Sequence, residues 1–144
     1  MECRQIRLND SLESKNIMQA QKTILIIEDE KSLRGALVDV LRLKNFIPLE
    51  AKNGKEGVEL ALLKRPSLIL LDLIMPEMDG TIVLKKIRER KWGKKVPIII
   101  LTNLSATDEQ FAAYITADTS TYYLIKSDWK IHDVVKKIEK ILAA

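Results

Sequence analysis

The chain has 144 residues, 47% hydrophobic and 31% charged, with 24 basic and 20 acidic residues for a net charge of +4. That length suits one domain with a sizeable core, and so mild a basic excess does not predict direct nucleic-acid binding. One cysteine excludes an internal disulfide framework, and no apolar stretch approaches the roughly 20 residues that cross a membrane.

Residues 1–21 are polar, mixed in charge and weakly periodic. We expect them to form a disordered tail, followed by one folded domain over residues 22–144. Met18 lies just before the first apolar run, so the natural start is either Met1 or Met18. The tail has no apolar core of a secretory signal, and we expect a cytoplasmic protein.

The first elements are two strands with a helix between them. An unbroken apolar run at Thr23–Ile27 predicts a central parallel strand. Phe46–Ala51 predicts a second strand, which Pro48 confines to an edge of the sheet. The intervening helix is predicted from apolar residues that recur with helical spacing: Leu33, Leu37, Val40 and Leu41.

A second helix begins where Asn53 can act as N-cap, with Glu56 three residues later. It is predicted to run to about Lys64, because Pro66 cannot continue it. The next apolar run, Leu68–Leu71, predicts another strand that is buried on both faces.

The following segment predicts helix, strand and helix. Asp79 opens a helix that is expected to end near Lys91. Pro97–Leu101 is apolar throughout and predicts the fourth strand, which Thr102 closes. A fourth helix is predicted over Asp108–Ile115.

The chain ends in a fifth strand and a fifth helix. Tyr122–Ile125 predicts the strand, and Lys126 terminates it. Ser127 or Asp128 is the expected N-cap of the helix. Its apolar stripe contains Ile131, Val134, Val135, Ile138, Ile141 and Leu142.

Strands that alternate with helices predict an α/β fold, in which right-handed crossovers cover both faces of a parallel sheet. Of the two common doubly wound arrangements, the five-stranded order 2-1-3-4-5 suits this length. All carboxyl ends of the strands then lie at one edge, where such folds bind their ligands.

Polar residues follow four of these strands at that edge: Glu28, Asp29, Asp72, Thr102 and Lys126. Three acids in one place repel one another and predict a hard divalent ion such as Mg²⁺. Asp72 is then placed to attack phosphorus as a nucleophile. Thr102 and Lys126 would stabilise charge on the transferred group.

These motifs resemble the receiver domain of two-component response regulators, of the single-domain, chemotaxis-regulator-like kind. The resemblance covers about Lys22 to the C-terminus and implies the flavodoxin-like receiver fold. The matching segments are Ile26–Glu30, Leu70–Pro76, Asp79-Gly80, Thr102 and Tyr123–Lys126.

The resemblance implies that Asp72 accepts a phosphoryl group from a histidine kinase or a phosphotransfer protein. Glu28 and Asp29 would hold Mg²⁺ or Mn²⁺ together with Asp72 and the backbone carbonyl of Ile74. Such a protein is a signalling phosphoacceptor that assists its own phosphorylation and dephosphorylation, and it is not classed as an enzyme.

The resemblance also implies how a signal would leave the domain. Thr102 and Lys126 would contact the phosphoryl oxygens, and Tyr123 would swing inward on activation. The surface of the fourth helix, fifth strand and fifth helix would then bind a downstream protein or a second copy of the chain.

Several positions depart from the family pattern, and two of them bear on phosphorylation and switching. Asn103 stands where a small residue is usual, and Ser127 stands where proline usually follows the lysine. A non-proline peptide at that point is expected to be trans. The alternative function is therefore a receiver-like scaffold that binds partners without phosphorylation.

The basic run Arg88–Lys95 has two interpretations. Cations near the end of a helix complement its dipole and are usually just solvated. Trp92 within the run instead favours a surface that binds a partner.

Overall fold

The computed structural model describes residues 22–73, 75, 78–102, 120–126 and 128–143. Five parallel strands form one sheet in the order β2-β1-β3-β4-β5, which confirms the predicted fold. The strands are β1 (Thr23–Ile27), β2 (Ile47–Ala51), β3 (Leu68–Asp72), β4 (Ile98–Thr102) and β5 (Thr121–Ile125). The strand that contains Pro48 lies at an edge, as proline requires.

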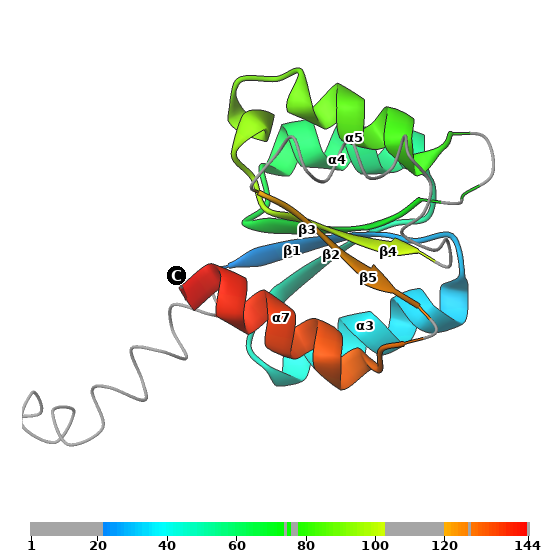
Figure 1. The fold of residues 1–144 in the computed structure, drawn as a ribbon, viewed down its shortest axis with the longest axis vertical. Helices are drawn as coiled ribbons and strands as arrows, with labels where there is room; N and C mark the ends of the chain where they lie inside the picture. The colour runs from blue at the N-terminus through cyan, green and yellow to red at the C-terminus, as the bar shows by residue number, and fades with distance from the viewer. Residues whose placement is uncertain (1–21, 74, 76–77, 103–119, 127, 144) are drawn as a thin grey trace, which may run out of the picture.

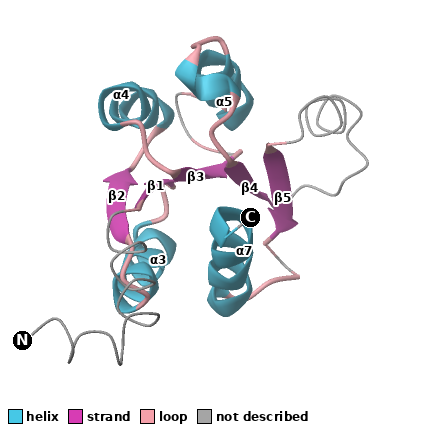
Figure 2. Cartoon of the chain, turned by 90° about the vertical axis from the view of Figure 1, so that its left-hand side faces the viewer, coloured by secondary structure: helices cyan, strands magenta, loops and turns pink. Residues whose placement is uncertain are grey.

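Helices cover both faces of the sheet, so the fold is doubly wound as predicted (Figures 1 and 2). One face carries α4 and α5, and the other carries α3 and α7. The described helices are α3 (Lys31–Leu43), α4 (Gly54–Lys64), α5 (Gly80–Arg88), the short 3₁₀ helix η1 (Trp92–Lys94) and α7 (Ile131–Ala143). The expected helix over Asp108–Ile115 and the expected tail over residues 1–21 lie outside the described residues.

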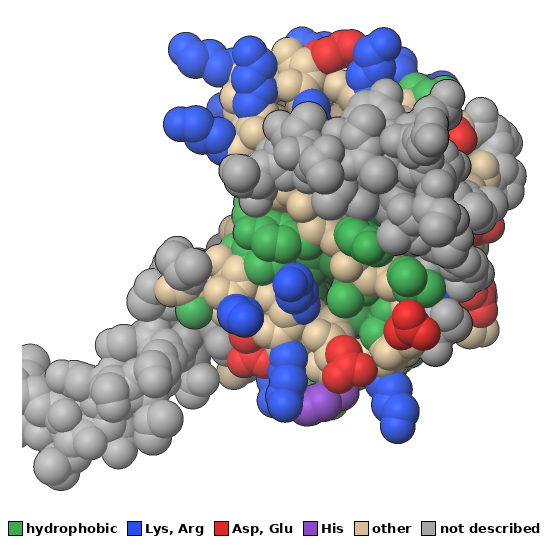
Figure 3. All heavy atoms as spheres, in the orientation of Figure 1, with side chains coloured by type: hydrophobic (Ala, Val, Ile, Leu, Met, Phe, Trp, Pro, Cys, Tyr) green, Lys and Arg blue, Asp and Glu red, His purple; other side chains and the backbone are tan. Residues whose placement is uncertain are grey.

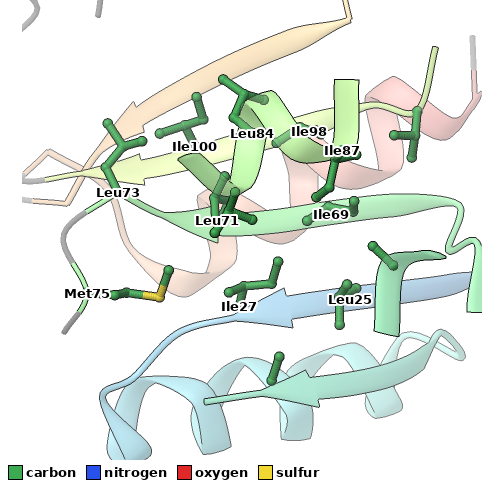
Figure 4. Close-up of a cluster of buried hydrophobic side chains, with 14 residues drawn as sticks. Leu25, Ile27, Ile69, Leu71, Leu73, Met75, Leu84, Ile87, Ile98 and Ile100 are labelled. Atoms are coloured by element: carbon green, nitrogen blue, oxygen red, sulfur yellow. The ribbon is translucent and has the colours of Figure 1, made fainter. Parts of the chain in front are cut away.

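The core has two layers because successive strand residues point to opposite faces. Figure 4 shows the layer under α4 and α5, to which four strands and both helices contribute. The central strands are buried on both faces, which explains their unbroken apolar sequence. Each such side chain stabilises the fold by about 1.5–3 kcal/mol. The labelled members of this layer are Leu25, Ile27, Ile69, Leu71, Leu73, Met75, Leu84, Ile87, Ile98 and Ile100.

The predicted helix starts at Asn53 and Asp79 are confirmed by side-chain caps. Asn53 Oδ1 accepts a 2.8 Å hydrogen bond from the N–H of Glu56. Asp79 Oδ1 accepts a 2.7 Å hydrogen bond from the N–H of Thr81. Each cap satisfies one of the helix N–H groups that has no partner inside the helix.

Several predicted element ends were wrong, among them the start of β2 and the end of α5. The strand begins after Phe46, because the Phe46 N–H bonds to the carbonyl of Leu41 and closes the preceding helix. The helix ends at Arg88 rather than near Lys91, and the chain then enters η1.

The predicted N-cap of the last helix was also wrong, because α7 begins at Ile131 rather than after Ser127 or Asp128. The N–H of Lys130 donates a 2.8 Å hydrogen bond to Asp133 Oδ2. The carboxylate of Asp133, one turn inside the helix, therefore accepts the hydrogen bond of the N–H group just before the helix.

The start of β1 and the end of α7 lie side by side. Lys22 Nζ donates a 2.9 Å hydrogen bond to the carbonyl of Leu142. This contact joins the first and last described elements on the α3 and α7 side of the sheet. None of the helices among the described residues is long and apolar enough to span a membrane.

Candidate functional site

Three carboxylates meet at the carboxyl edge of β1 and β3. Glu28 and Asp29 follow β1, and Asp72 is the last residue of β3. Because these strands pair directly, their carboxylate oxygens lie within 4.8 Å of one another. Glu28 and Asp72 are buried, with exposed fractions of 1% and 4%, whereas Asp29 is exposed. The structure therefore brings together the acids that the sequence placed at this edge.

Lys126 reaches the same acids from β5, although β4 lies between β5 and β3. Its Nζ atom is 2.8 Å from Glu28 Oε1 and 3.3 Å from Asp72 Oδ2. One half-buried ammonium thus offsets part of the charge of two buried carboxylates. The ion pair also links the end of β5 to the turn after β1.

The environment changes the pKa of Glu28 and of Lys126. Burial raises the pKa of Glu28 to about 8, the adjacent Asp72 adds to the increase, and Lys126 opposes it. Burial alone would lower the pKa of Lys126, but its hydrogen bond to Glu28 and the charges of Asp72 and Glu28 outweigh that effect and raise it. The site therefore has negative charge that a single lysine does not fully balance.

Arg34 of α3 holds the turn that carries the first two acids. Its guanidinium donates hydrogen bonds to the carbonyl of Glu28 at 2.8 Å and to the carbonyl of Asp29 at 3.4 Å. The same group pairs with Glu50 of β2, with Nε 3.3 Å from Oε1. Sequence reasoning missed this residue, because an arginine one turn into a helix carries no distinctive signal.

Gly80 packs against the backbone that carries Asp72. Its N–H donates a 2.8 Å hydrogen bond to the carbonyl of Leu73. A Cβ atom at this position would lie 2.5 Å from the carbonyl oxygen of Asp72 and 2.5 Å from Leu73 Cα. Only glycine allows α5 to begin this close to the end of β3.

The structure describes only some of the other expected site residues. Thr102 ends β4 and pairs with Ile125, but its side chain is not described. Tyr123 of β5 pairs with Ile100 of β4, and its half-buried side chain packs against the core layer under α4 and α5. Ile74, Asn103 and Ser127 lie outside the described residues.

The donor set fits a hard divalent cation. All three groups are carboxylates, whose oxygens suit Mg²⁺ and Mn²⁺. Glu28 Oε2 is buried, and among the described residues it has no hydrogen-bond partner. A buried oxygen without a donor is costly unless a cation or a proton satisfies it.

Comparison with known proteins identifies similar chains. A family model for the response regulator receiver domain matches residues 24–139. Histidine kinase P4 of Formosa agariphila is 40% identical over 102 residues, which cover 71% of this chain and 7% of the kinase. Transcriptional regulatory protein SrrA of Staphylococcus aureus is 47% identical over 79 residues, which cover 55% of this chain and 32% of SrrA. The chain thus spans less than a third of either relative.

A solved structure shares the fold and holds ligands. The response regulator TrrA from Thermotoga maritima, in complex with Mg²⁺ and BeF, is 28% identical to this chain. The two superpose with a TM-score of 0.70 over 83% of this chain and 98% of TrrA.

Proposed function

The chain belongs to the response regulator receiver domain family of two-component signalling, and we propose that Asp72 is its phosphoryl acceptor. The phosphoryl donor is a histidine kinase or a phosphotransfer protein. The observation that carries this proposal is the position of Asp72, whose carboxylate ends a central strand beside Glu28, Asp29 and Lys126. The domain that performs this function comprises residues 22–144, and it acts in the cytoplasm.

Asp72 would attack the phosphorus of the donor through a carboxylate oxygen. A P–O bond forms while the P–N bond to the donor histidine breaks, and the electron pair remains on that nitrogen. Lys126 Nζ, already 3.3 Å from Asp72 Oδ2, is placed to bind a phosphoryl oxygen. Thr102 at the end of β4 is a second candidate for this contact.

Glu28, Asp29 and Asp72, together with the backbone carbonyl of Ile74, are the proposed ligands of Mg²⁺ or Mn²⁺. A divalent ion bound there neutralises the charge of the acids and of the phosphoryl group. TrrA, which is similar in fold, was solved with Mg²⁺ and BeF, and this supports the assignment. The buried Glu28 Oε2 supports it from within this chain.

The output would be a protein contact, and the domain is a signalling phosphoacceptor rather than an enzyme. Binding of Thr102 and Lys126 to phosphate would favour one arrangement of the loops that follow β4 and β5. Tyr123 would follow this movement, and the surface formed by β5 and α7 would bind a downstream protein or a second copy of the chain.

Incubation with acetyl phosphate and Mg²⁺ tests the proposal. Mass spectrometry of the intact protein should show one added phosphoryl group, which is absent from Asp72→Asn and present in Asp39→Asn, an exposed acid on α3. If the wild-type protein took up no phosphate from acetyl phosphate or from phosphorylated kinases, the phosphorylation-independent scaffold would be the better hypothesis.

A further inference from the structure

A cationic cleft lies at the amino edge of the sheet, opposite the carboxylates. It has a volume of about 370 Å³ and is lined by Leu62, Arg65, Arg90, Lys91 and Trp92. These residues come from the end of α4 and from the turn after α5. Both segments lead into the starts of β3 and β4, whereas Asp72 lies where β3 ends. The cleft is therefore separate from the acidic site.

The wall of the cleft that contains Trp92 is tied to the body of the domain. Arg88 donates hydrogen bonds to the carbonyls of Gly93 at 2.8 Å, Val96, and Ser120 at 3.2 Å, and to Thr121 Oγ1 at 2.8 Å. These bonds join the turn to the start of β5.

Close packing fixes the same turn from the other side. A side chain at Gly93 would collide with the carbonyl of Ile87, so only glycine permits this approach. Trp92 packs in part against the core layer under α4 and α5. The cleft is therefore preformed, which lowers the entropy lost when a partner binds.

No described acid forms a salt bridge with the cations of the cleft. Within the part of the chain that the structure describes, the side chains of Arg65, Arg90 and Lys91 make no ion pair. Figure 3 shows Lys and Arg side chains gathered at the upper left, over the end of α5 and the turn that follows. Favourable interaction with the helix dipoles explains why cations lie near the carboxyl ends of α4 and α5. It does not explain why Trp92 and Leu62 line the same cleft.

We propose that this cleft binds an acidic peptide segment of a partner protein, with an apolar side chain of the peptide against Trp92 and Leu62. Its carboxylates would pair with Arg65, Arg90 and Lys91. Apolar surface beside the cleft continues along α4, where the side chain of Leu63 is 75% exposed. Arginine and tryptophan are also the residues that most often dominate binding energy at interfaces.

The backbone at the cleft favours a peptide over a phosphate ligand. Phosphate sites in proteins commonly use N–H groups at the start of a helix. Here the cleft instead lies at the carboxyl ends of α4 and α5, which carry backbone carbonyls rather than N–H groups. A peptide brings N–H donors for these carbonyls as well as carboxylates for the cations, whereas a nucleic acid or a polyphosphate brings mainly negative acceptors.

The test measures binding of fluorescein-labelled peptides to the full chain at physiological salt. The peptides share one Leu and one Phe and differ only in how many Asp and Glu residues they carry. Affinity should rise with the number of acids. Binding should shift the indole N–H resonance of Trp92, which is assigned separately from Trp129 with Trp92→Phe.

Charge-reversal variants locate the site. Arg90→Glu/Lys91→Glu and, from the other wall, Arg65→Glu should each weaken binding about tenfold or more. Lys136→Glu/Lys140→Glu on the exposed face of α7 makes the same change in net charge as the double variant and should stay within about twofold. Asp72→Asn should bind as the wild type does, because the acidic site is at the other edge.

Several results would overturn the proposal. Absence of peptide binding would do so, as would equal losses in the Arg90/Lys91 and Lys136/Lys140 variants, which would indicate attraction to net charge alone. Tighter cleft-dependent binding of duplex DNA or of inorganic polyphosphate would assign the cleft to another class of ligand. These outcomes are independent of whether Asp72 takes up phosphate.

Discussion

The ammonium group of Lys126 donates a 2.8 Å hydrogen bond to the buried carboxylate of Glu28, across 98 residues of sequence. This contact links the last strand of the sheet to the turn after the first. It also places the lysine within 3.3 Å of Asp72. The same cation therefore contributes to the stability of the domain and to the proposed chemistry.

Lys126→Met should destabilise the metal-free protein by about 1–3 kcal/mol, because the buried carboxylates of Glu28 and Asp72 lose their neighbouring cation. The free energy of unfolding in urea measures this loss. Lys140→Met, at an exposed position on α7, is the control and should change stability by less than about 0.5 kcal/mol. An equally small change for Lys126→Met would show that the pair contributes nothing to stability.

Stability without metal should fall as the pH rises. The pKa of Glu28 is about 8 in the folded state against 4.5 for the free side chain, so folding favours the protonated form. The stabilisation that this proton provides is complete below pH of about 4.5 and is lost as the pH rises through about 8. We expect the Tm in the presence of EDTA to decline over that range.

Glu28→Gln removes the titrating group and should flatten this part of the Tm profile. Saturating Mg²⁺ should flatten it as well, since a bound cation favours the ionised carboxylate. A wild-type Tm that increased between pH of about 4.5 and 8 and responded to Glu28→Gln would contradict the direction of this pKa shift.

Asp29→Asn should weaken Mg²⁺ binding by at least about tenfold, because it replaces one of three clustered carboxylates. The residue is exposed, so the fold should be unaffected. Titration with Mg²⁺, followed by amide resonances, measures the affinity. Asp39→Asn removes the same charge on the exposed face of α3 and serves as the control; wild-type affinity in Asp29→Asn would remove it from the proposed ligands.

Gly80→Ala should destabilise the domain by about 1–3 kcal/mol, because its Cβ would lie 2.5 Å from the carbonyl oxygen of Asp72. It should also slow phosphorylation by acetyl phosphate, since α5 would move away from the end of β3. Urea unfolding and the rate of phosphate uptake are the two measurements.

Gly35→Ala provides the matched control for this substitution. Gly35 lies inside α3, and a Cβ atom there meets nothing within 4 Å. Alanine should stabilise the helix by about 0.5–1 kcal/mol. If both alanine variants had the same effect, helix propensity rather than crowding at Asp72 would explain it.

The strands were predictable from local patterns, and the chain length then selected the strand order from the two common doubly wound arrangements. Unbroken apolar runs indicate central strands, and a parallel sheet places every carboxyl end at one edge. The proximity of Glu28, Asp29 and Asp72 then follows from strand order alone. Pro48 placed β2 at an edge for a similarly local reason.

Contacts made by long side chains could not be predicted in this way. The bonds of Arg34 to the carbonyls of Glu28 and Asp29 depend on how α3 packs after the turn. Those of Arg88 depend on the path of the chain around η1 and β5. The start of α7 was mispredicted because Ser127 and Asp128 are both good N-cap residues in the sequence. In the structure, the carboxylate of Asp133, inside the helix, instead accepts a hydrogen bond from the N–H of Lys130.

The hydrogen bond between Lys22 Nζ and the carbonyl of Leu142 has a consequence for protein engineering. Because the chain enters and leaves the fold at neighbouring points, a short flexible linker could join these two ends without crossing the sheet. The unit could be spliced into a surface loop of a host protein, where both junctions would occupy one small area. Circular permutants with new ends in a turn such as Lys44–Asn45 should fold into the same sheet.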